Sequence, residues 1–116
     1  MKRSNEPLVW ALFSGGGTLA AFLLPALAVL LWIAPQLGLV ETLTREQLAA
    51  KLHPPLVRAG LFALISLSLF HWAHRFRFTL YDGLQLKHLF GLIATICYGG
   101  AIVLTLLAAF LLVTFP

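Results

Sequence analysis

The amino-acid sequence predicts an all-α integral membrane protein with three antiparallel transmembrane helices. The first reason is composition, because 60% of the 116 residues are hydrophobic and only 10% are charged. Soluble domains are about 45–50% apolar and about 25% charged, and a small one cannot bury this much apolar surface. The second reason is arrangement. Three apolar stretches each reach the roughly 20 residues that a helix needs to cross a hydrocarbon core about 30 Å thick.

The first predicted span covers residues 10–33 and contains no charged residue. Residues 34–38 include a proline and a glycine, which predict the end of the helix because proline disfavours continuation and glycine favours a C-cap. The small residues Ser14-Gly15-Gly16-Gly17 inside this span would let another backbone approach closely. Residues 42–52 have one polar and one apolar face. They predict a short interfacial helix with Thr42 or Thr44 as its N-cap.

The second predicted span covers residues 56–78 and the third covers residues 89–115, with Asp82-Gly83 as the break between them. All three spans belong to one membrane-anchor domain, residues 1–116. The second span differs from the others because several polar side chains lie towards its end, namely His71, His74, Arg75 and Arg77.

The lysines and arginines indicate the orientation of the chain in the membrane. They flank the apolar runs, as membrane-anchoring charges do, so the net charge of +4 does not indicate a nucleic-acid partner. Five of them fall at one end of the spans and three at the other: Lys2, Arg3, Arg75, Arg77 and Lys87 against Arg45, Lys51 and Arg58. This bias predicts a cytoplasmic N-terminus and a C-terminus outside.

Trp10 and His74 are expected to lie at the same depth in the membrane. His74 follows Leu56 by about 18 residues, which is roughly 27 Å along a helix and therefore near the cytoplasmic end of the second span. Trp10 opens the first span at that end. Two hydrogen-bond donors at one level among apolar helices could hold the head group of a quinone. Alternatively, Trp10 is an aromatic-belt anchor and His74 an ordinary interfacial residue.

His71 and His74 are three residues apart, so both face the same side of one helix. His71 could ligate a haem whose second axial ligand comes from another chain, or it could hydrogen-bond to a partner helix. Arg75 and Arg77 can extend to the interface and bind lipid phosphate or an acidic partner surface. The candidate functional side chains of the second span are thus concentrated at its end.

What the sequence lacks also narrows the function. No acidic residue lies inside a predicted span, which argues against a transporter that couples to ions. We find no nucleophile with a base, no zinc motif and no nucleotide-binding loop, so no catalytic or metal-binding residue is predicted. The single cysteine, Cys97, excludes an internal disulfide. Any catalytic chemistry is therefore expected in partner subunits.

The N-terminal residues combine with the second span into a recognisable pattern. Its parts are Lys2-Arg3-Ser4-Asn5-Glu6-Pro7, Trp10, Phe13, Ser14-Gly15-Gly16-Gly17, His74-Arg75 and Asp82. This pattern resembles the fumarate reductase D-subunit family over nearly the whole chain. The resemblance implies a hydrophobic membrane anchor of menaquinol:fumarate reductase, which acts in anaerobic respiration in the bacterial inner membrane.

The same resemblance implies partners and site residues. A second three-helix anchor, of the kind known as the C subunit, would pair with this chain. Both would dock an iron–sulfur subunit and a flavoprotein at the cytoplasmic face, and those two proteins would hold the iron–sulfur clusters and the FAD. Menaquinol would be oxidised near this face. By position in the motifs, Trp10, His74 and Arg75 are the implied quinol-binding residues.

His71 departs from the better-known members of that family, which carry cysteine there and lack haem. Related succinate dehydrogenase anchors carry a haem-ligating histidine eleven residues before an aspartate, the same spacing as that of His71 and Asp82 here. A haem b-containing anchor of the succinate dehydrogenase type is therefore the alternative, with His71 as the haem ligand. A purely structural assembly factor would be expected only if redox partners were absent.

Overall fold

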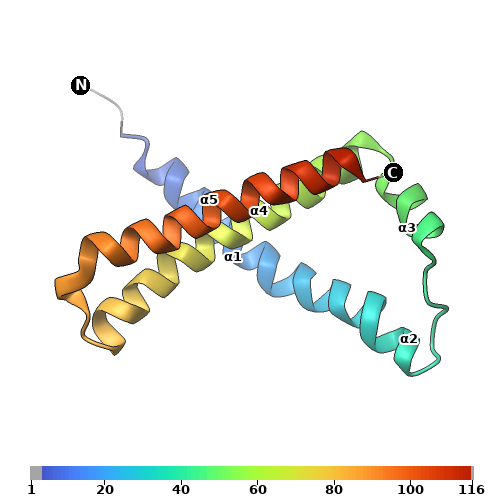
Figure 1. Ribbon diagram of the computed structural model, residues 1–116, viewed down its shortest axis with the longest axis horizontal. Helices are drawn as coiled ribbons and strands as arrows, with labels where there is room; N and C mark the ends of the chain where they lie inside the picture. The colour runs from blue at the N-terminus through green and yellow to red at the C-terminus, as the bar shows by residue number, and fades with distance from the viewer. Residues whose placement is uncertain (1–3, 116) are drawn as a thin grey trace.

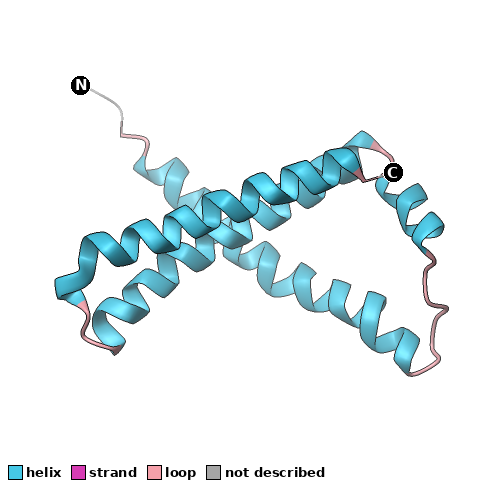
Figure 2. Ribbon diagram, viewed as in Figure 1, coloured by secondary structure: helices cyan, strands magenta, loops and turns pink. Residues whose placement is uncertain are grey.

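The computed structural model describes residues 4–115, so Lys2 and Arg3, which entered the orientation prediction, lie outside the described residues. Within this range the chain consists of helices joined by short connections (Figure 2). Three continuous helical stretches there, Glu6–Gln36, Pro55–Gly83 and Lys87–Thr114, are long and apolar enough to cross a membrane. The predicted all-α membrane fold with three spans is confirmed.

The first span continues past its predicted end. It comprises α1 (Glu6–Ala28), the π-helical segment η1 (Val29–Ile33) and a last turn, α2 (Ala34–Gln36). A proline ring normally clashes with the carbonyl of the preceding turn. Here the wider π turn before Pro35 changes the spacing of those carbonyls, so the helix continues through it. The chain turns only at Gly38, whose φ of 70° suits glycine.

The short helix predicted over residues 42–52 is present as α3 (Arg45–Leu52). Of the two predicted cap residues, Thr44 is the N-cap. Its hydroxyl accepts a hydrogen bond from the Gln47 backbone N–H at 3.2 Å, and the Gln47 side chain accepts one from the Thr44 N–H at 2.9 Å. This reciprocal pair satisfies two backbone donors and fixes where the helix begins.

The second and third spans form an antiparallel hairpin (Figure 1). The helix α4 (Pro55–Phe78) continues as the π-helical η2 (Thr79–Gly83), and α5 (Phe90–Thr114) follows the 3₁₀ turn η3 (Lys87–Leu89). The chain therefore reverses just after the predicted break at Asp82-Gly83, where Gln85 has a φ of 53°.

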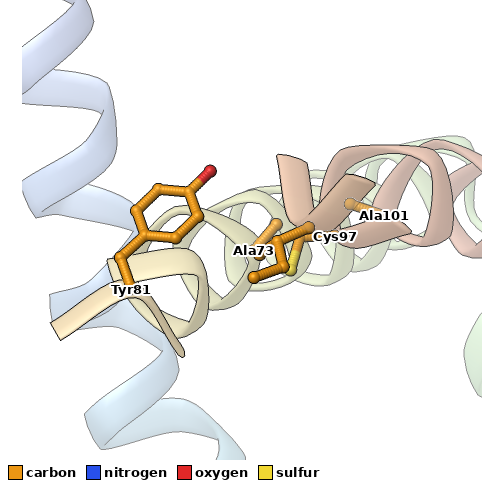
Figure 3. Packing of buried hydrophobic residues seen from close by; sticks show 5 residues of the cluster. Ala73, Tyr81, Cys97 and Ala101 are labelled. Atoms are coloured by element: carbon orange, nitrogen blue, oxygen red, sulfur yellow. The ribbon is translucent and has the colours of Figure 1, made fainter. Parts of the chain in front are cut away.

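Small side chains allow the two helices of this hairpin to approach closely. Ala73 on α4 and Cys97 and Ala101 on α5 are almost fully buried, and Tyr81 and Ile93 complete the cluster (Figure 3). Cys97 is a free thiol in this packing. Side chains of this size leave little distance between the backbones, which is how membrane helices gain contact without a hydrophobic driving force.

At the opposite end of the hairpin, Arg58 joins three segments. Its Nε donates to the Leu52 carbonyl at 2.7 Å, and its Nη1 and Nη2 donate to the carbonyls of Val113 and Phe115 at 3.4 and 3.2 Å. The last carbonyls of a helix have no partner within the helix. A cation there satisfies them and also interacts favourably with the helix dipole.

The first span crosses the hairpin at an angle instead of lying along it (Figure 1). The contact is between α1 and α4, and Gly16 is the buried residue of α1. A Cβ added to Gly16 would lie only 3.0 Å from the Leu67 Cβ and 3.1 Å from the Leu67 carbonyl oxygen. The predicted close approach of another backbone is therefore found at Gly16, whereas an added Cβ at Gly15 would meet nothing within 4 Å. Beyond the crossing the span diverges, and Phe22 and Trp32 are 74% and 68% exposed.

Candidate functional site

A cavity of about 330 Å³ lies where the first span crosses the hairpin. All three long helices contribute to its walls: Val9, Trp10, Leu12 and Phe13 from α1, Leu67, Phe70, His71 and His74 from α4, and Tyr98 from α5. Its volume is at the lower end of the range of about 300–1,000 Å³ that is usual for small-molecule sites. Most of the lining is apolar or aromatic, with a few polar groups among it.

The structure brings Trp10 and His74 together, although they are far apart in the sequence. Their ring centroids are 6.0 Å apart and the ring planes are nearly perpendicular, at 86°. The Phe13 ring packs edge-on against both, at 5.7 Å from Trp10 and 4.8 Å from His74. Trp10 is 57% exposed, so the cavity wall at this position is open to lipid or to another chain.

Two hydrogen bonds meet at one ring nitrogen of His74. The Tyr98 hydroxyl lies 2.9 Å from Nδ1, and Nη2 of Arg77 lies 3.3 Å from the same atom. A guanidinium can only donate, so Nδ1 must be the acceptor. We therefore assign the neutral His74 ring the tautomer with its proton on Nε2. The imidazole then has a donor available on the edge opposite Tyr98.

Arg77 and Arg75 lie in different surroundings despite being two residues apart. The guanidinium of Arg77 stacks over aromatic rings, 4.6 Å from the Phe78 centroid and 5.2 Å from that of Tyr98. Cation–π contacts of this kind hold a cation against a protein surface. Arg75 is exposed, and it is not among the residues that line the cavity.

His71 connects α4 to α1. Its Nδ1 lies 3.0 Å from the Phe13 carbonyl oxygen, to which it donates, and its ring stacks on the Phe13 ring at 4.3 Å. The ring also rests against Gly17, where an added Cβ would overlap it, at 2.7 Å from Nδ1. The imidazole therefore occupies the space that the missing side chain of Gly17 leaves. This arrangement matches the predicted hydrogen bond from His71 to another helix, here within the same chain.

Tyr98 contacts the candidate site directly, although it was not predicted from the sequence. A signal for it was present. In an antiparallel hairpin, residues equally far from the turn lie at the same level, and His74 and Tyr98 are equidistant from Leu86 in the turn. A tyrosine at the level of a candidate histidine, in an otherwise apolar span, is a natural hydrogen-bond partner.

The arrangement suits a flat, largely apolar ring that carries oxygen atoms. Aromatic side chains can stack against the faces or edges of such a ring. His74 and the indole N–H of Trp10 can donate hydrogen bonds to its oxygens. Among residues 4–115, no group of three or more histidine, cysteine or carboxylate side chains lies close enough together to hold a metal ion.

Comparisons with known proteins agree with one another. Residues 1–113 match the protein family of the fumarate reductase D subunit. The chain is 40% identical over 113 residues to the fumarate reductase D subunit of Mycobacterium tuberculosis, covering 97% of this chain and 90% of that protein. It is 36% identical over 81 residues to the protein of that name from Actinobacillus pleuropneumoniae serotype 5b, covering 70% and 68%. No solved structure matches it significantly.

Proposed function

The chain belongs to the fumarate reductase D-subunit family, and we propose that it is the anchor that contributes the quinol site of a membrane-bound fumarate reductase. The family and the three apolar spans establish a membrane-anchor role in a fumarate reductase complex. The observation that carries the proposed quinol site is the convergence of Trp10 and His74 on one aromatic cavity. Quinones interact with this class of membrane anchor, and the proposed substrate here is menaquinol.

The cavity residues have defined parts in this proposal. The naphthoquinol ring lies among Trp10, Phe13 and Phe70, and Nε2–H of His74 donates to one of its oxygens. Quinol oxidation releases two protons and two electrons. Iron–sulfur clusters and FAD, held by the proposed partner subunits, would accept the electrons and supply the reduction of fumarate, which takes up two electrons and two protons to become succinate. This chain binds and orients the quinol ring.

The exposed surfaces support the proposed partners. The part of the first span beyond the crossing has no cover within residues 4–115, and a second three-helix anchor, the C subunit of such a complex, would cover it. The iron–sulfur subunit and the flavoprotein would dock at the end that carries Trp10 and His74. Arg75, exposed at this end, would contact either the quinol head group or the docked partner.

The count of basic residues supports the proposed orientation only when the N-terminal ones are included. Arg75, Arg77 and Lys87 lie in the last turn of α4 and in η3, whereas Arg45, Lys51 and Arg58 lie in α3 and at the start of α4, so the described residues divide three against three. Lys2 and Arg3, which precede the first span in the sequence, raise the count on the side of the N-terminus to five. Positively charged residues accumulate on the cytoplasmic side of a membrane. The N-terminus would then be cytoplasmic and the C-terminus outside, in the inner membrane of the bacterial cell.

Purification of tagged chain from membranes in mild detergent tests the anchor role. We expect three partners in stoichiometric amounts: a flavoprotein, an iron–sulfur protein and a second small membrane protein. Mass spectrometry identifies the proteins, and absorbance identifies the flavin and the clusters. Recovery of the chain without any of them, from membranes that reduce fumarate, would contradict the proposal.

For His71 we propose a role that joins α1 to α4, and not haem ligation. Its Nδ1 donates to the Phe13 carbonyl, and its ring stacks on Phe13 and rests against Gly17, so the imidazole already forms part of the helix contact. Its other nitrogen, Nε2, is the atom that would bind iron in the haem alternative. We derive no haem-dependent step.

A reduced-minus-oxidised spectrum of the purified complex tests this conclusion. We expect His71→Ala to leave the visible spectrum unchanged, because the ring holds two helices together and does not bind iron. His53→Ala, an exposed histidine outside the cavity, is the matched control. A b-type haem band that disappears in His71→Ala but persists in His53→Ala would establish the haem-containing alternative.

A further inference from the structure

We propose that Tyr98 is a positioning residue for quinol binding, which it supports by holding the His74 ring in the orientation from which Nε2–H can donate. This inference rests on the proposed quinol site and adds to it a residue on the third span. The contact that carries it is the 2.9 Å hydrogen bond between the Tyr98 hydroxyl and Nδ1 of His74.

The direction of this hydrogen bond follows from Arg77. A tyrosine hydroxyl can donate or accept, so its contact with a histidine nitrogen alone does not fix the tautomer. The guanidinium has only donors, and its Nη2 lies 3.3 Å from the same Nδ1. A proton on Nδ1 would face this donor, so the proton belongs on Nε2 and the Tyr98 hydroxyl donates as well.

Aromatic rings hold the Arg77 guanidinium where it can donate to Nδ1 of His74. Its guanidinium lies over the rings of Phe78, Tyr81 and Tyr98, the last two at 5.9 and 5.2 Å. Tyr98 therefore acts twice, through its hydroxyl on His74 and through its ring under Arg77. These two roles can be separated, because phenylalanine keeps the ring and removes only the hydroxyl.

The consequence for the ligand is a donor with a fixed position. A histidine side chain without a partner at Nδ1 can carry its proton on either nitrogen and can rotate about its χ angles. With Nδ1 occupied by Tyr98 and Arg77, the Nε2–H is available for a quinone carbonyl without first being ordered. A preorganised donor binds more tightly because less conformational freedom is lost on binding.

The test compares Tyr98→Phe with Tyr81→Phe in the assembled complex, with 2,3-dimethyl-1,4-naphthoquinone as the probe. Tyr81 is a matched control, since its ring also lies near Arg77, but its hydroxyl donates to the Phe90 carbonyl at 3.0 Å, away from His74. We expect Tyr98→Phe to raise the dissociation constant of the probe about three- to tenfold, as loss of one hydrogen bond would. Tyr81→Phe should leave it within about twofold.

Infrared spectra of the bound probe give a readout that a general packing defect would not produce. Hydrogen bonding lowers the stretching frequency of a quinone carbonyl. We expect one carbonyl band of the bound probe to move towards its unbound frequency in Tyr98→Phe and to stay in place in Tyr81→Phe. In a His74→Ala background, Tyr98→Phe should have no further effect on affinity, because it acts through His74.

The outcomes separate this inference from the quinol site itself. If His74→Ala weakens binding while Tyr98→Phe behaves like Tyr81→Phe, Tyr98 has no positioning role and the quinol site stands. If His74→Ala binds the probe as tightly as the unmodified complex, the site assignment and the inference fall together. Weaker binding in Tyr98→Phe that persists undiminished in the His74→Ala background would also overturn the inference.

Discussion

Replacing His74 with alanine is expected to lower quinol-dependent fumarate reduction about ten- to hundredfold. The change removes the proposed donor to the quinol. It also leaves the Tyr98 hydroxyl and Nη2 of Arg77 without their acceptor. Loss of the donor leaves a buried quinol oxygen unpaired, which costs about 1–3 kcal/mol, and each 1.4 kcal/mol is a factor of ten. The measurement is the steady-state rate with a soluble naphthoquinol as electron donor. Trp10→Leu should lower the same rate by a smaller factor.

Two controls make this result specific. Fumarate reduction from a soluble reductant that bypasses the membrane site should stay unchanged in His74→Ala, since we propose that the flavin and clusters belong to other subunits. His53→Ala should retain the quinol-dependent rate, because His53 is exposed and does not line the cavity. An assembled complex that keeps its full quinol-dependent rate in both His74→Ala and Trp10→Leu would remove these residues from the proposed site.

The depth of Trp10 and His74 could be predicted from the sequence because depth depends only on counting. A helix rises 1.5 Å per residue, so the distance of each residue from the end of its span follows directly. The ring contact at 6.0 Å is consistent with that prediction. What the sequence could not supply was the direction in which each side chain points about the helix axis.

The direction of each side chain about its helix axis could not be predicted because the spans are largely apolar on all sides. A helix in a soluble protein shows its buried face by a stripe of apolar residues, whereas a helix surrounded by lipid shows no such stripe. The crossing of the first span over the hairpin therefore could not be read from periodicity. Counting from the turn places Tyr98 at the level of His74, but nothing in its own span marks the face of the helix on which it lies.

Arg75 and Arg77, within one turn of α4, illustrate how side-chain direction escapes prediction from the sequence. Successive residues are rotated by about 100°, so residues two apart point to nearly opposite sides. Both Arg75 and Arg77 were expected to be able to reach the interface, and the family resemblance made Arg75, and not Arg77, an implied quinol-binding residue. In the structure Arg75 is exposed, whereas Arg77 packs over aromatic rings and reaches His74.

The cavity and the crossing of α1 over α4 depend on the same contacts. Phe13 uses its ring as part of the cavity wall and its carbonyl as the acceptor for His71. Gly17 accommodates the His71 ring one turn further along α1. The position of Trp10 opposite His74 is therefore set by how closely α1 approaches α4 at these two residues.

Gly17→Leu is expected to displace α1 from α4 and to reduce both quinone binding and the quinol-dependent rate by about tenfold or more. Even a Cβ at this position would overlap the His71 ring, which is held by its hydrogen bond to Phe13 and by stacking. Forcing atoms into a packed contact typically costs about 1–3 kcal/mol through shifted side chains and backbone. The measurements are the affinity for the naphthoquinone probe and the yield of assembled complex.

Gly15→Leu is the matched control, because it makes the same substitution two residues earlier on α1, where an added Cβ meets nothing within 4 Å. It should bind the probe with nearly unchanged affinity. Equal damage in Gly15→Leu and Gly17→Leu would mean that contacts with another subunit, and not the approach of α1 to α4, set the position of Trp10. A large effect confined to Gly17→Leu would instead tie the geometry of the quinol site to one glycine that never touches the quinol.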